Sequence, residues 1–138
     1  MSKQITRTIR VEFGDCDPAR IVWLPNFFRW IDAASRHYFV QCGGLGRSAE
    51  KALGVIGTPL VDTHSHFLPT AAYGDMLDIQ VTIPQWREKR FVESYRLMRG
   101  EELIMECDEV RIIAGRCTNN QEAIRSLPIP AEIRSLCE

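Results

Sequence analysis

The sequence predicts an α+β fold in which an antiparallel sheet curves around one long helix. One segment, residues 25–42, has helical periodicity and apolar side chains on most of its faces. A series of strand-like segments follows it from residue 58 onward, with no second long helix between them. Consecutive strands after a single helix favour α+β over an alternating α/β arrangement. A helix this apolar must be covered on most sides, so we expect the sheet to wrap it.

The first half of the chain is predicted to contain a strand, a turn and this helix. Ile5, Ile9, Val11 and Phe13 alternate with polar residues, which indicates a strand. Residues 14–24 are typical of a turn. The helix is expected to begin at Pro25 and Asn26 and to end at Gly43-Gly44. A short second helix is expected over residues 47–53.

The second half is predicted to consist of strands joined by turns. The clearest strand covers residues 77–83, where apolar and polar side chains alternate without interruption. Other strands are expected over residues 60–67, 90–98 and 103–114, with a tight hairpin at Gly100, and a last short strand over residues 124–129.

Composition limits the classes of function. The 138 residues fit one domain covering residues 1–138, and 45% hydrophobic with 25% charged residues is ordinary for a soluble globular protein. A net charge of -1 gives no general attraction to nucleic acid. No apolar run is long enough to cross a membrane and no signal peptide is recognisable, so we expect a cytoplasmic protein that does not interact with membranes. The five cysteines lack paired spacing, which predicts free thiols and no metal site.

The segment Gly14-Asp15-Cys16-Asp17-Pro18 is the strongest candidate for chemistry, because it lies between a strand and the start of the long helix. Free N–H groups at a helix N-terminus stabilise developing negative charge on an oxygen. A carboxylate beside them can attack a thioester carbonyl or activate water toward it. The alternative is that Asp15 or Asp17 only caps the turn. A metal pair is disfavoured, since no third ligand lies close in sequence.

Two further groups of polar residues allow two interpretations each. His64 and His66 share one face of a strand, as a zinc pair would, but polar residues on a strand surface also fit this spacing. Arg87, Lys89 and Arg90 cluster beside Trp86 at a predicted hairpin. Such a cluster can bind nucleotide phosphates, or it can be a solvated sheet edge.

The chain resembles the 4-hydroxybenzoyl-CoA thioesterase family of the hot-dog superfamily, through residues 10–19, 21–23, 25–26, 29–36, 57–59, 86–89 and, weakly, 124–130. The resemblance implies a hot-dog fold, and a homodimer or homotetramer with active sites at the subunit interface. It also implies roles for individual residues: Asp17 as the catalytic nucleophile or general base, backbone N–H groups near Trp23 and Leu24 against the thioester carbonyl, Asp32 and Thr58 at the acyl pocket, and Arg87, Lys89 and Arg125 on coenzyme A phosphates.

The implied activity is hydrolysis of an acyl-CoA thioester, 4-hydroxybenzoyl-CoA or a related aryl-CoA, to free acid and coenzyme A without a metal or cofactor. The sequence departs from the family at Arg20, where members usually have Gly, and at Leu24, where they have an aromatic residue or His. Two alternatives stay open: a non-catalytic acyl-CoA-binding protein, and an enoyl-thioester hydratase. The hydratase pattern places a His five residues after the Asp, where this chain has Val22.

Overall fold

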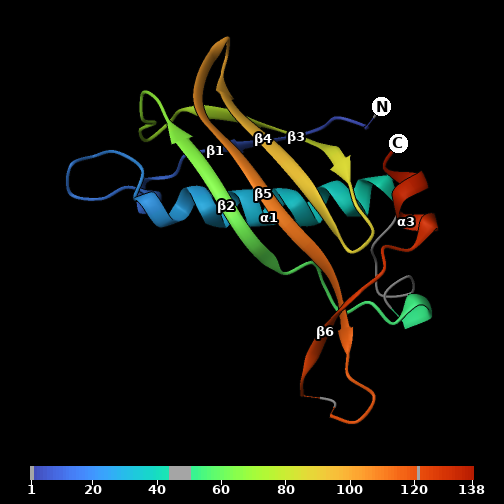
Figure 1. The fold of residues 1–138 in the computed structure, drawn as a ribbon. Helices are drawn as coiled ribbons and strands as arrows, with labels where there is room; N and C mark the ends of the chain where they lie inside the picture. Colours follow the sequence, from blue (N-terminus) through green and yellow to red (C-terminus); the bar gives the residue numbers. More distant parts are fainter. Residues whose placement is uncertain (1, 44–50, 121) are drawn as a thin grey trace.

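The computed structural model describes residues 2–43, 51–120 and 122–138 (Figure 1). The helices and strands, in chain order, are β1 (Ile5–Arg10), the 3₁₀ turn η1 (Phe13–Asp15), α1 (Leu24–Cys42), β2 (Leu60–Phe67), β3 (Met76–Trp86), β4 (Arg90–Arg99), β5 (Glu102–Arg116), β6 (Ile124–Leu127) and α3 (Ala131–Leu136).

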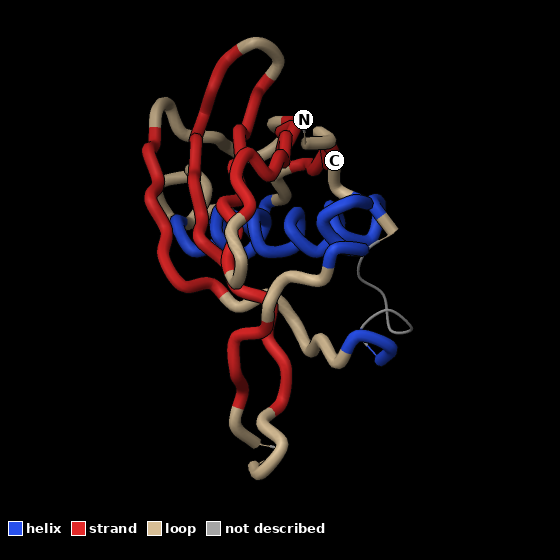
Figure 2. Tube along the Cα trace, turned by 45° about the vertical axis from the view of Figure 1, so that its right-hand side comes forward, coloured by secondary structure: helices blue, strands red, loops and turns tan. Residues whose placement is uncertain are grey.

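The strands form one six-stranded antiparallel sheet in the order β1-β3-β4-β5-β2, with β6 paired to the far end of β5. Figure 1 shows α1 lying across the concave face of this sheet, and Figure 2 shows the β5–β6 hairpin extending away from the body. The prediction of a hot-dog fold, an antiparallel sheet around one long helix, is therefore confirmed.

The core lies between α1 and the sheet, because each strand turns every second side chain toward the helix. Leu77, Ile79, Val81 and Ile83 of β3 are fully buried in this layer, as their alternation predicted. The helix contributes a buried stripe: Asn26, Phe27, Trp30, Ile31, Ala34, Ser35, Tyr38, Phe39 and Cys42. Gly43 ends α1 in the left-handed conformation, with φ of 80°, which glycine adopts without strain.

Several predicted boundaries were wrong by a few residues. β1 stops at Arg10 rather than continuing to Phe13, because the Asp15 carboxylate accepts a hydrogen bond from the Glu12 N–H and draws the chain into η1. The last strand ends at Leu127, since Pro128 cannot donate to a sheet.

Helix α3 was not predicted, because six residues are too short to show helical periodicity. Within the predicted second helix, residues 51–53 are helical and the remainder lies outside the described residues, as does Gly44.

One edge of the sheet is open. Among residues 2–43, 51–120 and 122–138, β2 pairs only with β5, and nearly all of the residues of β2 are exposed. Its exposed side chains include Leu60, Val61 and Phe67. No helix in the described part of the chain combines the length and the apolar character that crossing a membrane requires.

Candidate active site

Asp17 lies in a turn that holds its carboxylate in one direction. The Ala19 N–H donates to Asp17 Oδ1 at 2.8 Å, and the Arg20 N–H donates to the Asp17 carbonyl at 2.8 Å. The Asp17 N–H in turn donates to the Ile21 carbonyl at 2.9 Å, which closes the turn. Arg20 completes it with φ of 67°, in the left-handed region that glycine adopts more easily.

The neighbouring Asp15 has a structural role. Its carboxylate accepts from the Glu12 N–H at 2.8 Å and from Arg29 at 3.1 Å. Its carbonyl accepts from the Asn26 side chain at 2.8 Å and from the Trp23 N–H at 2.9 Å. Asp15 therefore fixes the segment before α1 against the beginning of that helix, so the capping interpretation holds for Asp15.

The backbone donors expected near Trp23 and Leu24 differ in their partners. The Trp23 N–H donates to the Asp15 carbonyl within the chain. Leu24 is the first residue of α1, and the first N–H groups of a helix have no acceptor inside it. Within the described ranges no other group accepts from the Leu24 N–H, so Leu24 is the better candidate donor.

A cavity of about 680 Å³ opens beside Asp17. Its lining residues are Phe13, Cys16, Asp17, Pro18, Arg20 and Tyr73. Phe13 is 81% exposed, and its ring meets Tyr73 edge-on with the ring centroids 6.1 Å apart. Trp23 and Leu24 are exposed close by in the sequence. So many exposed apolar side chains around one carboxylate indicate a surface that a ligand or a second protein covers.

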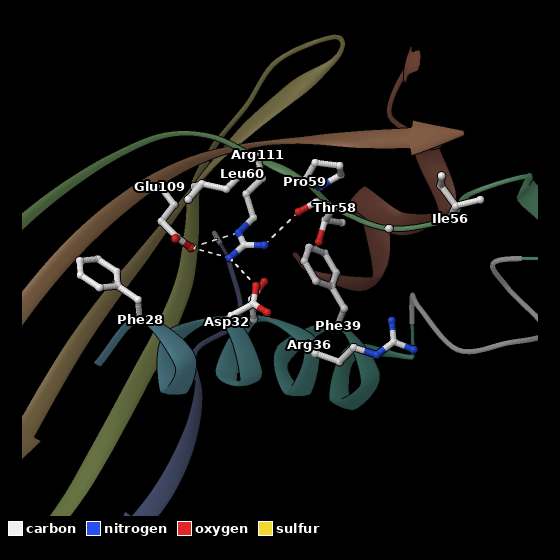
Figure 3. A pocket seen from close by; sticks show the side chains of 12 residues that line it. Phe28, Asp32, Arg36, Phe39, Ile56, Thr58, Pro59, Leu60, Glu109 and Arg111 are labelled. Atoms are coloured by element: carbon white, nitrogen blue, oxygen red, sulfur yellow. Dashed lines mark hydrogen bonds and ion pairs between the residues drawn. The ribbon is translucent and has the colours of Figure 1, made fainter. Parts of the chain in front are cut away.

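Asp32 and Thr58 meet at a second cavity, of about 560 Å³, between α1 and the segment leading into β2. Arg111 of β5 connects them, as Figure 3 shows. Its guanidinium donates to Asp32 Oδ1 at 3.1 Å and to the Thr58 carbonyl at 2.9 Å. The described structure thus brings Asp32 and Thr58 together, but the residues that line their cavity and those that line the Asp17 cavity do not overlap.

Three buried charged residues, Glu93, Glu109 and Arg111, form a group that was not predicted from the sequence. Arg111 donates to Glu109 Oε1 from Nε at 3.0 Å and from Nη2 at 2.9 Å, and its Nε lies 3.8 Å from Glu93 Oε1. Glu93 is fully buried and accepts hydrogen bonds from the Ser35 and Tyr95 hydroxyls. We name Asp32, Glu93, Glu109 and Arg111 the Arg111 cluster.

The pKa values in this cluster reflect its burial. Desolvation raises the pKa of Glu93 to about 7, although the hydrogen bonds from Ser35 and Tyr95 and the charge of Arg111 act in the opposite direction. Burial lowers the pKa of Arg111, but the neighbouring acidic groups raise it by more, so the guanidinium stays charged. Glu93 therefore changes its charge close to neutral pH, while Arg111 does not.

The alternation of inward and outward side chains along a strand could have revealed the Arg111 cluster from the sequence. Glu93 stands between Phe91 and Tyr95 on the helix-facing side of β4, and Glu109 and Arg111 occupy the same side of β5. A charged side chain at an inward position of a strand requires a partner when it is buried.

The three expected phosphate-binding cations lie at one end of the molecule. Arg87, Lys89 and Arg125 are exposed, and none forms a salt bridge with a described residue. Two hydrogen bonds join their segments: the Ile129 N–H donates to the Glu88 carbonyl at 2.8 Å, and the Ser126 hydroxyl donates to the Lys89 carbonyl at 3.4 Å. Arg87 and Arg125 nevertheless line separate hollows.

His64 and His66 point away from the core, opposite Asp108 and Glu106 of β5. In residues 2–43, 51–120 and 122–138, no three His, Cys, Asp or Glu side chains are grouped so as to hold a metal ion. This placement fits the polar-surface interpretation of the two histidines.

The family of this chain follows from its similarity to known proteins. The profile of the thioesterase-like superfamily matches residues 11–136. The chain belongs to the thioesterase-like superfamily. A curated member, 4-hydroxybenzoyl-CoA thioesterase from Pseudomonas sp. (strain CBS-3), is 43% identical over 143 residues that cover 99% of each chain.

Two solved structures are also similar to this chain. The first is a crystal structure of 4-hydroxybenzoyl-CoA thioesterase mutant D17N complexed with 4-hydroxybenzoyl-CoA; it is 42% identical, with a TM-score of 0.90 over 98% of this chain and 99% of that one. The second is BH1999 gentisyl-coenzyme A thioesterase, which is 27% identical, with a TM-score of 0.80 over 94% of this chain and 99% of that one.

Proposed function

We propose that this thioesterase-superfamily chain hydrolyses an aryl-CoA thioester, with 4-hydroxybenzoyl-CoA as the substrate, to the free acid and coenzyme A. The observation that carries the proposal is the Asp17 carboxylate beside a cavity of about 680 Å³. One of its oxygens is held by the Ala19 N–H, and the other has no partner in the part of the chain that the structure describes. The 43% identical relative, a 4-hydroxybenzoyl-CoA thioesterase, supports this choice of substrate.

Asp17 acts on the thioester carbonyl as the nucleophile or as the general base. As a nucleophile it forms an acyl anhydride and expels the coenzyme A thiolate, and water then opens the anhydride. As a base it takes a proton from the water that attacks the carbonyl. In both routes negative charge develops on the carbonyl oxygen, where the Leu24 N–H and the positive end of the 19-residue helix α1 stabilise it.

The acyl ring and the nucleotide are held by different regions. Asp32 and Thr58 line the ring cavity, where the Asp32 carboxylate accepts a hydrogen bond from the phenolic hydroxyl. Arg87, Lys89 and Arg125 bind the phosphates of coenzyme A, since exposed cations that form no salt bridge with a described residue suit that ligand.

The two cavities are joined in a homodimer, itself paired as a homotetramer, in which Asp17 of one subunit faces Asp32 and Thr58 of the other. The open edge of β2 and the exposed apolar side chains beside Asp17 support such an assembly. A cytoplasmic location stays a prediction from the sequence.

Thiol release by the wild type and Asp17→Asn tests the proposal, with 4-hydroxybenzoyl-, benzoyl-, phenylacetyl- and hexanoyl-CoA as substrates. We expect the wild type to prefer 4-hydroxybenzoyl-CoA. Asp17→Asn should lower kcat by roughly 10² to 10⁴, because it removes the nucleophile or base while leaving the binding contacts. Asp78→Asn is the matched control, since that carboxylate lies on the outer face of β3 and accepts from Thr8.

Two outcomes would contradict the proposal. If the wild type binds 4-hydroxybenzoyl-CoA but releases no thiol from any of the four, the chain is a binding protein. If it cleaves the corresponding acyl-pantetheine, which lacks the nucleotide, with the same KM as the acyl-CoA, the role of the three cations is wrong.

A further inference from the structure

The Asp32 carboxylate is mostly exposed, whereas the Arg111 guanidinium that binds it is buried. The Asp32 side chain is 76% exposed and the Arg111 side chain only 6% exposed. An exposed aspartate on a helix surface ordinarily samples several rotamers. Here the guanidinium approaches from the sheet side and binds Oδ1 at 3.1 Å, which fixes the carboxylate over the cavity (Figure 3).

Arg111 is itself immobilised. Nη1 donates to the Thr58 carbonyl, and Nε and Nη2 both donate to Glu109 Oε1. Glu109 is 2% exposed, so protein packing holds its carboxylate in place, and that carboxylate in turn holds the Arg111 guanidinium. A planar guanidinium with all three nitrogens engaged has one orientation, and it transmits that orientation to Asp32.

The charges in the Arg111 cluster do not balance. Asp32, Glu93 and Glu109 supply three carboxyl groups around the one guanidinium of Arg111. Asp32 Oδ2 has no donor among the residues that the structure describes. A bound acyl group therefore meets a fixed acceptor oxygen, in a cavity that Glu109 and Arg36 also line.

Resting on the proposed function, we propose that Arg111 is a positioning residue that selects the acyl substituent. By fixing Asp32, it presents an acceptor to a ring substituent that is a neutral hydrogen-bond donor, such as a hydroxyl or an amino group. The Asp32 carboxylate accepts hydrogen bonds and donates none, so it disfavours a ring substituent that is itself a carboxylate. Arg111 does not contact the reacting carbonyl, so its effect is on discrimination between substrates.

Discrimination is measured as the ratio of kcat/KM for 4-hydroxybenzoyl-CoA to kcat/KM for benzoyl-CoA. Asp32→Asn and Arg111→Gln should each lower this ratio roughly ten- to a hundredfold, because the positioned acceptor is lost. The double variant should have the same ratio as Asp32→Asn, since both changes remove one interaction. Arg111→Lys, which keeps a cation beside Glu109, should recover part of the ratio. Arg96→Lys, on the outer face of β4, is the matched control.

Arg111→Gln leaves Glu109 without its partner and can fail to fold, so the wild type provides an independent test. It should cleave 4-aminobenzoyl-CoA in preference to benzoyl-CoA. It should cleave 4-carboxybenzoyl-CoA at least tenfold less efficiently than benzoyl-CoA, because placing the ring carboxylate beside Asp32 brings two like charges together.

The outcomes separate this inference from the function on which it rests. Equal losses on 4-hydroxybenzoyl- and benzoyl-CoA in the Arg111 variants would show a purely structural role and overturn the inference while hydrolysis stands. Efficient cleavage of 4-carboxybenzoyl-CoA would also overturn it. Absence of turnover with every thioester would overturn the proposed function and this inference together.

Discussion

The two carboxylate sites of this protein are built in opposite ways. Asp17 is half-buried, belongs to one continuous turn, and is held by a single backbone N–H at 2.8 Å. The Arg111 cluster draws Asp32, Glu93, Glu109 and Arg111 from α1, β4 and β5, and three of the four are buried. A carboxylate that must react needs an oxygen free of other partners. A carboxylate that must recognise a substituent needs a fixed position, which a rigid sheet provides.

The largest difference between the Asp17 turn and the Arg111 cluster should appear in how each affects the dependence of stability on pH. The pKa of Glu93 is about 7 in the fold against an ordinary 4.5. Between these values the folded state keeps a proton that the unfolded state has lost, so the free energy of unfolding falls as the pH rises from 4.5 to 7. The whole fall is roughly 3 kcal/mol. Glu93→Gln should remove this slope, as measured by urea unfolding from pH 4.5 to pH 8.

Asp17→Asn provides the comparison in that experiment. It should keep the wild-type slope, because Glu93 is unchanged. A Glu93→Gln variant with the slope of the wild type would show that the buried glutamate does not hold its proton, and the contrast between the two regions would disappear.

The second expected effect concerns how the two regions meet. Asp17→Asn and Asp32→Asn should each be poor catalysts on 4-hydroxybenzoyl-CoA. In the proposed homodimer, refolding the two variants together makes half of the dimers hybrids. One of the two sites in each hybrid carries both intact residues, so about a quarter of wild-type activity should return. If each site were built from one chain, the mixture would show only the average of its parents. Each variant refolded alone is the control.

The smallest expected effect is local strain beside Asp17. Arg20 has φ of 67°, and left-handed backbone costs a non-glycine residue about 1 kcal/mol. Arg20→Gly should raise the free energy of unfolding by about 0.5 to 1 kcal/mol, and Arg20→Val should lower it, because a β-branched side chain tolerates this conformation poorly. Urea unfolding measures both. A destabilised Arg20→Gly would mean that the Arg20 side chain stabilises the turn by contacts that outweigh the strain.

The sequence predicted the architecture because its signals are regular and long. The alternation in β3 and the apolar stripe of α1 extend over many residues, so packing reinforces each residue's local preference. The short elements were less predictable. β1 ended early because the Glu12 N–H donates to the Asp15 carboxylate, and α3 has one buried residue, Ile133, to mark it.

The same distinction applies to the site. Asp17 could be proposed from the sequence because the residues that hold its turn, Ala19 to Ile21, are also its neighbours in sequence. The sequence could not distinguish the Trp23 N–H from the Leu24 N–H, because the acceptor of the Trp23 N–H on Asp15 depends on how η1 folds back against α1. The Arg111 cluster joins residues up to 79 positions apart. Only the strand register places the four residues of the Arg111 cluster together. Charged residues at inward strand positions could nevertheless have indicated a buried ion pair.

The bare edge of β2 has a consequence for the life of the newly made chain. Eight residues, Leu60–Phe67, offer backbone groups on one side to any extended segment that arrives, and the apolar side chains beside them add attraction. A chain that has folded alone is therefore exposed to aggregation until its edge is covered. In the proposed homodimer a second copy covers this edge, so the yield of native protein should depend on how fast copies assemble relative to how fast they aggregate.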